Sequence, residues 1–186
     1  MPEVVDLVDA IGREHLRILR LVDRLVEGCQ NLALHEHAAR KAAATLVALE
    51  SRHEAAEVRY LWPVVRDALP EYADIRATAE AQEREARRLL HTLSKSLKPA
   101  SAPAEVGAVS KSIRIHIGLE DSQLLPALKA TLDPNDSVRL GRLFVEASAN
   151  GPTRPHPRLP AVPGLVAAAS PLAARVDRVR DLLRIR

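Results

Sequence analysis

The chain has 186 residues, enough for one domain with a sizeable buried core, and 47% of them are hydrophobic but only 2% are aromatic. The core should therefore be aliphatic, and the scarcity of glycine and of β-branched or aromatic runs favours an all-α fold. The net charge of +3 is too small to call for nucleic acid, the single cysteine excludes an internal disulfide, and no uncharged apolar run is long enough to span a membrane.

Apolar residues recur every three or four positions in five successive stretches, as they do along amphipathic helices. We expect Gly28 and Asn31 to end the first helix and Pro63 to kink or loosen the second. Asp133 and Pro134 are typical of the cap and first turn of the last helix. The predicted helices cover residues 3–27, 37–69, 72–97, 104–130 and 133–149.

The four long helices, joined by short connections, predict an antiparallel up-down-up-down four-helix bundle. Five prolines at intervals of two or three residues then predict an extended linker, and an amphipathic helix with arginines on one side follows it. We therefore expect extra C-terminal helices and three regions: a bundle with a short fifth helix over residues 1–150, a Pro-rich linker over 151–169, and a C-terminal helix over 170–186. The last helix should dock on protein, and self-association is one way to do so.

The pattern His-x-x-x-Glu occurs twice, at His53–Glu57 and His116–Glu120, and Leu-x-Pro follows both copies at the same offsets. Residues four apart share one face of a helix. One such pair alone is typical of a solvated helix face. Two copies that also share the downstream residues favour two equivalent halves of one metal site.

In the predicted bundle, these pairs lie at the same level along the bundle axis. Glu57 and Glu83 each lie roughly a dozen positions from the turn near residue 71, on helices that rise 1.5 Å per residue. Glu83 and His116 also lie at nearly equal numbers of positions from the connection near residue 100, on either side of it. His15, set in the apolar stripe of the first helix, matches His53 less closely. All four helices can thus place a polar side chain in one layer.

These residues resemble the hemerythrin-like (HHE cation-binding) domains over about residues 5–132: a histidine in the first helix, then His-x-x-x-Glu with Leu-x-Pro in the second and fourth. The resemblance implies a four-helix bundle that holds two iron ions with an oxo or hydroxo bridge. Such a centre has histidines as terminal ligands and two bridging carboxylates. Carried over, the terminal ligands are His15, His53 and His116, and the bridging ligands are Glu57 and Glu120.

The chain departs from this family at two positions. The third helix normally contributes a histidine, and the alignment of the two halves places Glu83 there, with Glu80 and Glu85 close by as alternatives. Tyr60, one turn after Glu57, replaces an aliphatic residue; it is either a metal ligand or a core tyrosine hydrogen-bonded to a bridging carboxylate. With Glu83 and a Tyr60 phenolate as ligands, the formal charge of an oxo-bridged diferric centre cancels, which favours ferric iron and disfavours reversible oxygen carriage.

We therefore expect an enzyme, a catalase-like di-iron oxidoreductase that decomposes hydrogen peroxide, with Glu83 and Tyr60 as catalytic residues. Two alternatives remain: a module that binds or senses oxygen, nitric oxide or iron without turnover, and a structural bundle that recruits a partner through its basic last helix. The expected partner is a small oxidant such as hydrogen peroxide, dioxygen or nitric oxide. The start Met-Pro-Glu-Val-Val-Asp lacks the pattern of a signal peptide, and with the lone Cys29 it favours a cytoplasmic location.

Overall fold

The computed structural model describes residues 5–30, 36–95 and 102–155. Every regular element in these ranges is helical, so the predicted all-α class is confirmed. The predicted C-terminal helix, residues 170–186, lies outside the described residues. The elements are α1 (Leu7–Gln30), α2 (Glu36–Ala56), the π-helical η1 (Glu57–Leu61), α3 (Trp62–Ala68), the 3₁₀ turn η2 (Pro70–Tyr72), α4 (Ala73–Leu93), α5 (Pro103–Leu119), the π-helical η4 (Glu120–Leu124), α6 (Leu125–Thr131) and α7 (Pro134–Asn150).

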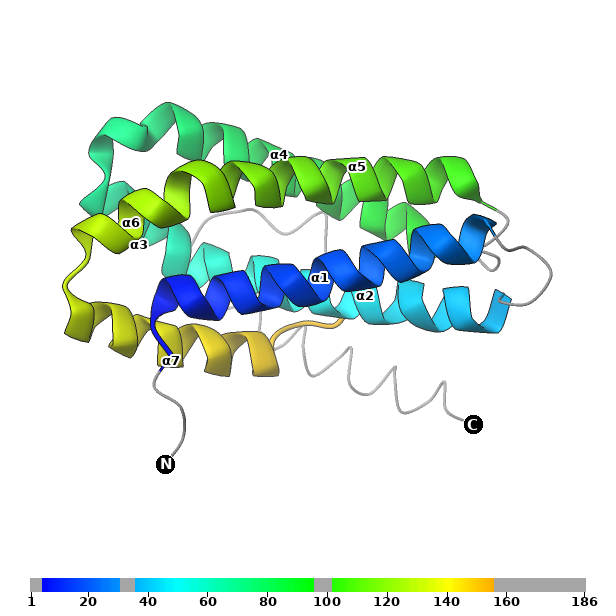
Figure 1. The fold of residues 1–186 in the computed structure, drawn as a ribbon, viewed down its shortest axis with the longest axis horizontal. Helices are drawn as coiled ribbons and strands as arrows, with labels where there is room; N and C mark the ends of the chain where they lie inside the picture. Colours follow the sequence, from blue (N-terminus) through cyan, green and yellow to red (C-terminus); the bar gives the residue numbers. More distant parts are fainter. Residues whose placement is uncertain (1–4, 31–35, 96–101, 156–186) are drawn as a thin grey trace.

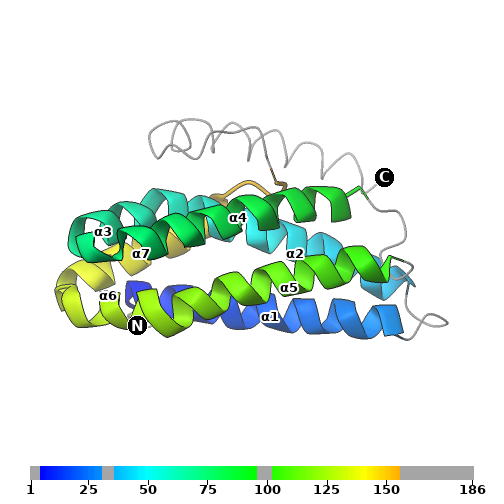
Figure 2. The ribbon, with the colours of Figure 1, turned by 90° about the horizontal axis from the view of Figure 1, so that it is seen from above.

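The helices form long rods that lie side by side (Figure 1). The α2, η1 and α3 segments follow one another without a loop and make one rod, and α5, η4 and α6 make another. The α1 helix packs against α2 and α5, and the α4 helix packs against α5 and α2. Figure 2 shows α1 lying beside α5. The α7 helix packs against α1 and α2. No helix in the described ranges is long and apolar enough to cross a membrane.

Two apolar clusters fill the interior, one toward each end of the rods. The first apolar cluster holds the aromatic side chains of Trp62 and Phe144, and aliphatic residues make up the rest of both clusters, largely as composition predicted. Burying one such side chain contributes about 1.5 to 3 kcal/mol. Members of the first apolar cluster are Leu7, Ala10, Ile11, Ala56, Val58, Leu61, Trp62, Val65, Leu69, Ala79, Leu124, Leu125, Leu128, Leu140 and Phe144. Members of the second are Ile18, Val22, Leu25, Ala39, Ala43, Leu46, Val47, Leu90, Leu93, Val106, Val109, Ile113 and Ile117.

The helix boundaries confirm one expectation and correct another. Asp133 caps α7 by accepting hydrogen bonds from the backbone N–H groups of Asn135 and Asp136, with Pro134 in the first turn, as predicted. The first helix was expected to end at about residue 27, with Gly28 and Asn31 as the stop; it continues through Gly28 to Gln30, and Asn31 lies outside the described residues. A Cβ on Gly28 would lie 3.2 Å from Cβ of Ala39, so this glycine lets α2 approach α1 closely.

Candidate metal centre

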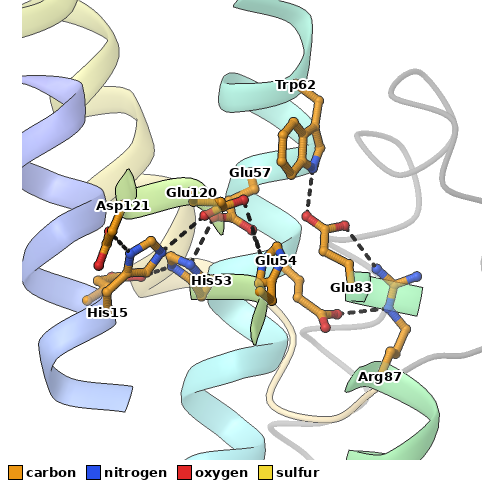
Figure 3. Close-up of polar contacts among 11 residues, drawn as sticks. His15, His53, Glu54, Glu57, Trp62, Glu83, Arg87, Glu120 and Asp121 are labelled. Carbon is orange, nitrogen blue, oxygen red and sulfur yellow. Dashed lines mark hydrogen bonds and ion pairs between the residues drawn. The ribbon is translucent and has the colours of Figure 1, made fainter. Parts of the chain in front are cut away.

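Six of the seven predicted metal ligands meet in one buried layer between the two apolar clusters. Their side chains are His15, His53, Glu57, Glu83, His116 and Glu120. The donor atoms form two groups, and within each group one atom from every residue lies within 4.8 Å of the others. We call His15 and His53 the first half-site, and Glu83 and His116 the second half-site; Glu57 and Glu120 belong to both groups. Figure 3 shows these two shared carboxylates lying between the histidines of the first half-site and Glu83.

Each shared carboxylate turns one oxygen toward each half-site. Oε1 of Glu57 lies 2.9 Å from Nε2 of His53, and its Oε2 lies 3.9 Å from Nε2 of His116. Oε2 of Glu120 lies 3.2 Å from Nε2 of His15, and its Oε1 lies 3.5 Å from Nε2 of His116. A carboxylate oriented in this way can bridge two cations.

The atoms that converge in this layer have no hydrogen-bond partners among the described residues. These atoms are Nε2 of His15, His53 and His116 and both carboxylate oxygens of Glu57 and Glu120. Nε2 of His53 and Oε1 of Glu57 lie 2.9 Å apart, yet neither atom has a partner that meets hydrogen-bond geometry. A buried polar atom left without a partner costs about 1 to 3 kcal/mol. Bound cations would satisfy all seven atoms, so the residues fit a metal pair.

A local change of helix type accompanies each shared carboxylate. Glu57 and Glu120 are the first residues of the π-helical segments η1 and η4, and the following residues Trp62 and Leu125 donate their N–H groups to the carbonyls five positions back. A proline clashes with the carbonyl four positions before it and has no N–H to donate. Widening the turn just before the proline of each Leu-x-Pro relieves this clash. The repeated Leu-x-Pro thus accompanies paired π segments, which often occur at functional sites, and the first of them agrees with the loosened turn expected at Pro63.

Both histidines of the first half-site are held by carboxylates on their other ring nitrogen. Nδ1 of His15 lies 2.7 Å from Oδ1 of Asp121, and Nδ1 of His53 lies 2.9 Å from Oε2 of Glu14. A carboxylate only accepts hydrogen bonds, so each Nδ1 carries the proton and donates it. When the ring is neutral, as metal binding requires, the lone pair lies on Nε2, which faces the shared carboxylates. Metal-bound histidines commonly have this arrangement, in which the outer carboxylate fixes the orientation of the ring.

In the second half-site, hydrogen-bond donors hold the carboxylate of Glu83. Nε1 of Trp62 donates to Oε1 of Glu83 at 2.6 Å, and a guanidinium nitrogen of Arg87 lies 3.9 Å from Oε2. Nε of Arg87 also donates to Glu54 at 2.8 Å (Figure 3). Nδ1 of His116, in contrast, is buried without a hydrogen-bond partner among the described residues.

Crowding of buried charge shifts the pKa of these groups in the metal-free chain. Burial, reinforced by the charge of Glu57, raises the pKa of Glu83 well above its ordinary value. Burial acts to raise the pKa of Glu57 too, but the facing imidazoles of His53 and His116 outweigh it and hold that pKa well below its ordinary value. Burial lowers the pKa of His116, but the charges of Glu120 and Glu57 prevail and raise it to about 10. Without metal, protons on the imidazoles balance the carboxylates.

The structure separates Glu83 from the alternatives on the same helix. Glu83 is buried, whereas Glu80 forms an ion pair with Arg76 and the exposed Glu85 forms one with Arg88.

Tyr60, the seventh predicted ligand, is placed differently. Its ring is partly exposed and packs against the first apolar cluster, with the guanidinium of Arg59 at 5.2 Å from the ring centre. Within the described ranges, no hydrogen bond or ion pair joins its hydroxyl to the six converging residues. Metal binding by Tyr60 stays a prediction.

Sequence reasoning missed the groups that surround the ligands. Glu14 and Asp121 are chain neighbours of His15 and Glu120, but adjacent residues on a helix point about 100° apart, so adjacency did not predict a contact. Both meet their histidines across a helix interface. Arg87 is four residues from Glu83, a spacing that could have indicated the pair.

Compared with protein-family models, the chain matches the Hemerythrin HHE cation binding domain over residues 6–128. The matched stretch contains all residues of both half-sites and both shared carboxylates. Neither the curated proteins nor the solved structures gave a significant match.

Proposed function

Because the chain belongs to the Hemerythrin HHE cation binding domain family, we propose that it holds two iron ions in the buried layer, one at each half-site. His15 and His53 would hold one ion, Glu83 and His116 the other, and Glu57 and Glu120 would bridge them. Imidazole and carboxylate donors projecting inward from helices suit non-haem iron.

The observation that carries this proposal is the orientation of the shared carboxylates. Glu57 directs Oε1 to His53 and Oε2 to His116, and Glu120 directs Oε2 to His15 and Oε1 to His116. If the site held a single cation, one oxygen of each carboxylate would remain buried without a partner, at a cost of about 1 to 3 kcal/mol each. Two cations use all four oxygens.

We also infer that the rods form the antiparallel up-down-up-down bundle expected from the sequence. Two exposed ion pairs support it for α1 and the α5–α6 rod, because Asp9 pairs with Lys129 while the later Asp23 pairs with the earlier Arg114. The α2–α3 rod and α4 also run in opposite directions, because a later residue of one contacts an earlier residue of the other. Glu54 pairs with Arg87, while the later Trp62 bonds to the earlier Glu83.

Decomposition of hydrogen peroxide is the activity we propose for this centre. An iron pair supplies the redox chemistry when bound. The chain supplies three carboxylates, Glu57, Glu83 and Glu120, which favour the higher oxidation state because their negative charge offsets that of the metal. Burial of the layer between apolar clusters favours a small neutral oxidant over a large substrate. Glu83 lies in the second half-site, where a carboxylate could take up a proton that peroxide gives up.

Counting oxygen released per peroxide consumed by the iron-loaded chain tests this activity. A ratio of one half over many turnovers, as the balance of two peroxides to two waters and one oxygen requires, would support it. We expect Glu83→Gln to slow turnover per bound iron, and the exposed Glu85→Gln on the same helix to leave it unchanged. Peroxide consumption that stops after about one equivalent per centre would favour a binding or sensing module instead.

A further inference from the structure

The α7 helix lies after the matched family domain, which ends at residue 128, yet it reaches the first half-site. Oγ of Ser148, in the last turn of α7, donates a hydrogen bond to Oε1 of Glu14 at 2.6 Å. The other oxygen of Glu14 accepts from Nδ1 of His53 at 2.9 Å. A continuous chain of hydrogen bonds therefore connects α7 to a predicted metal ligand.

Ser148 constrains a carboxylate that could otherwise turn away. Glu14 has a relative side-chain exposure of 12%, so water can reach it, whereas His53 is 1% exposed. Ser148 is itself buried. With one oxygen fixed by a buried hydroxyl, the other oxygen stays directed at His53, and this keeps the proton on Nδ1 and the lone pair on Nε2.

The rest of α7 is packed firmly enough to serve as a fixed support. The hydroxyl of Ser137 accepts a hydrogen bond from the backbone N–H of Leu7 at 3.3 Å, at the start of α1. A Cβ on Gly141 would lie 2.5 Å from the carbonyl oxygen of Val5, so this glycine allows the backbones of α7 and the α1 entry to touch. The ring of the fully buried Phe144 meets the His53 ring edge-on, with ring centres 5.8 Å apart.

We propose that α7 is a built-in positioning element of the metal centre, and that Ser148 is its positioning residue, acting through Glu14 on His53. This inference rests on the proposed iron pair and deepens it. It assigns a role in metal binding to a part of the chain outside the family domain. The hydrogen bonds of Ser148 and Glu14 lead to His53, so the support acts on the first half-site. Among the described residues, Ser148 does not bond to Glu83 or His116.

The test uses the full chain loaded with Co²⁺, whose unpaired electrons shift the proton signals of bound imidazoles far from the protein envelope. The variants are Ser148→Ala, Ser148→Thr and the control Ser137→Ala, which removes a buried hydroxyl of the same helix that does not touch Glu14. Competition with a chelator gives the affinity of each of the two cobalt equivalents. Proton exchange at the shifted imidazole N–H signals reports how each ring is held.

We expect Ser148→Ala to weaken one cobalt equivalent roughly threefold to tenfold, less than the 10- to 100-fold typical for loss of a direct partner of a ligand. One imidazole N–H signal should exchange faster, and Ser148→Thr, which keeps the hydroxyl, should restore both readouts. Glu14→Ala, a second variant in the same link, should affect the same signal more strongly. Ser137→Ala, which loses one hydrogen bond at the other end of the same helix, should change both readouts much less than Ser148→Ala does.

Two results would overturn the inference, and they are distinguishable. If the unaltered chain binds two cobalt ions and Ser148→Ala behaves like Ser137→Ala, α7 does not position His53, and the proposed metal centre stands. If the unaltered chain binds no cobalt, the metal centre itself is wrong and the inference falls with it.

Discussion

The two half-sites use opposite means to present their donor atoms. In the first, both donors are imidazoles, and carboxylates on the far side of each ring, Asp121 and Glu14, fix the rings from behind. In the second, one donor is the carboxylate of Glu83, which is held by an N–H group of Trp62, and the ring of His116 has no such partner among the described residues.

This difference indicates how the work is divided within one centre. A histidine whose other ring nitrogen donates to a carboxylate is a stronger metal ligand with a fixed orientation. We therefore expect the first half-site to retain its metal more firmly than the second. The second half-site adds negative charge and leaves one imidazole less constrained. We expect ligand exchange and proton transfer to occur there, while Glu57 and Glu120 couple the two halves.

The largest effect should come from removing a carboxylate that both halves share. Glu120→Gln keeps the shape of the side chain but removes the charge that faces His15 and His116, so both half-sites should lose affinity. We expect iron content to fall from two per chain to near zero, as measured by metal analysis after chelator dialysis. Glu105→Gln, an exposed change in the first turn of the same rod, is the control. Retention of one iron in Glu120→Gln would show that the halves are independent.

Removal of the carboxylate that accepts from one imidazole should weaken metal binding at one half-site and not at the other. Asp121→Ala removes the acceptor for Nδ1 of His15, and loss of such a partner lowers metal affinity by about 10- to 100-fold. Only one of the two metal equivalents should weaken in a chelator competition. Asp23→Ala, which breaks an exposed ion pair between the same two rods, should leave both unchanged. Equal weakening of both equivalents would contradict the assignment of His15 to one half.

Metal uptake should release protons and become tighter as the pH rises. The pKa of His116 is raised to about 10 in the metal-free chain, because Glu120 and Glu57 outweigh the effect of burial, so its ring carries a proton at neutral pH. A metal needs that lone pair, and the proton must leave. Affinity should therefore rise by about tenfold per pH unit for each proton released below pH 10. An indicator dye in weak buffer measures the release, and His116→Ala should release fewer protons.

The smallest effect on metal binding is expected at Trp62. Trp62→Phe keeps an aromatic ring in the first apolar cluster but removes the N–H group that bonds to Glu83. The free energy of unfolding of the metal-free chain should fall by about 1 to 3 kcal/mol, the range for a buried hydrogen bond to an ionisable group. Denaturant unfolding measures this fall, and iron content should stay at two per chain. Loss of one iron would show that the orientation of Glu83 depends on Trp62.

The convergence of these residues could be predicted from the sequence because their positions follow a rule that acts along one helix. His53 and Glu57 repeat at His116 and Glu120, and counting from a turn placed Glu83 at the same depth. Residues that meet across an interface follow no such rule. The Ser148 hydroxyl reaches Glu14 over 134 positions of sequence, and which faces oppose each other depends on the packing of the whole fold.

Tyr60 and the π segments show a second limit. The sequence placed Tyr60 on the face of His53 and Glu57 by assuming a regular turn of 3.6 residues. A π segment begins at Glu57, so the turn that carries Tyr60 differs from the regular one assumed, and the ring is partly exposed. The sequence predicted a kinked or loosened turn at Pro63 but not how it bears on Tyr60, whose binding to metal stays a prediction.

The central claim is that Glu57 and Glu120 join two metal ions in one buried layer. Stepwise loading of the metal-free chain with ferrous iron, followed by oxidation and electron paramagnetic resonance at each step, tests it most directly. Bridged ferric ions pair their spins, so we predict uptake that ends at two irons per chain and a ferric form with almost no resonance signal. Uptake that ends at one iron, with a strong signal from isolated ferric ions, would contradict the account.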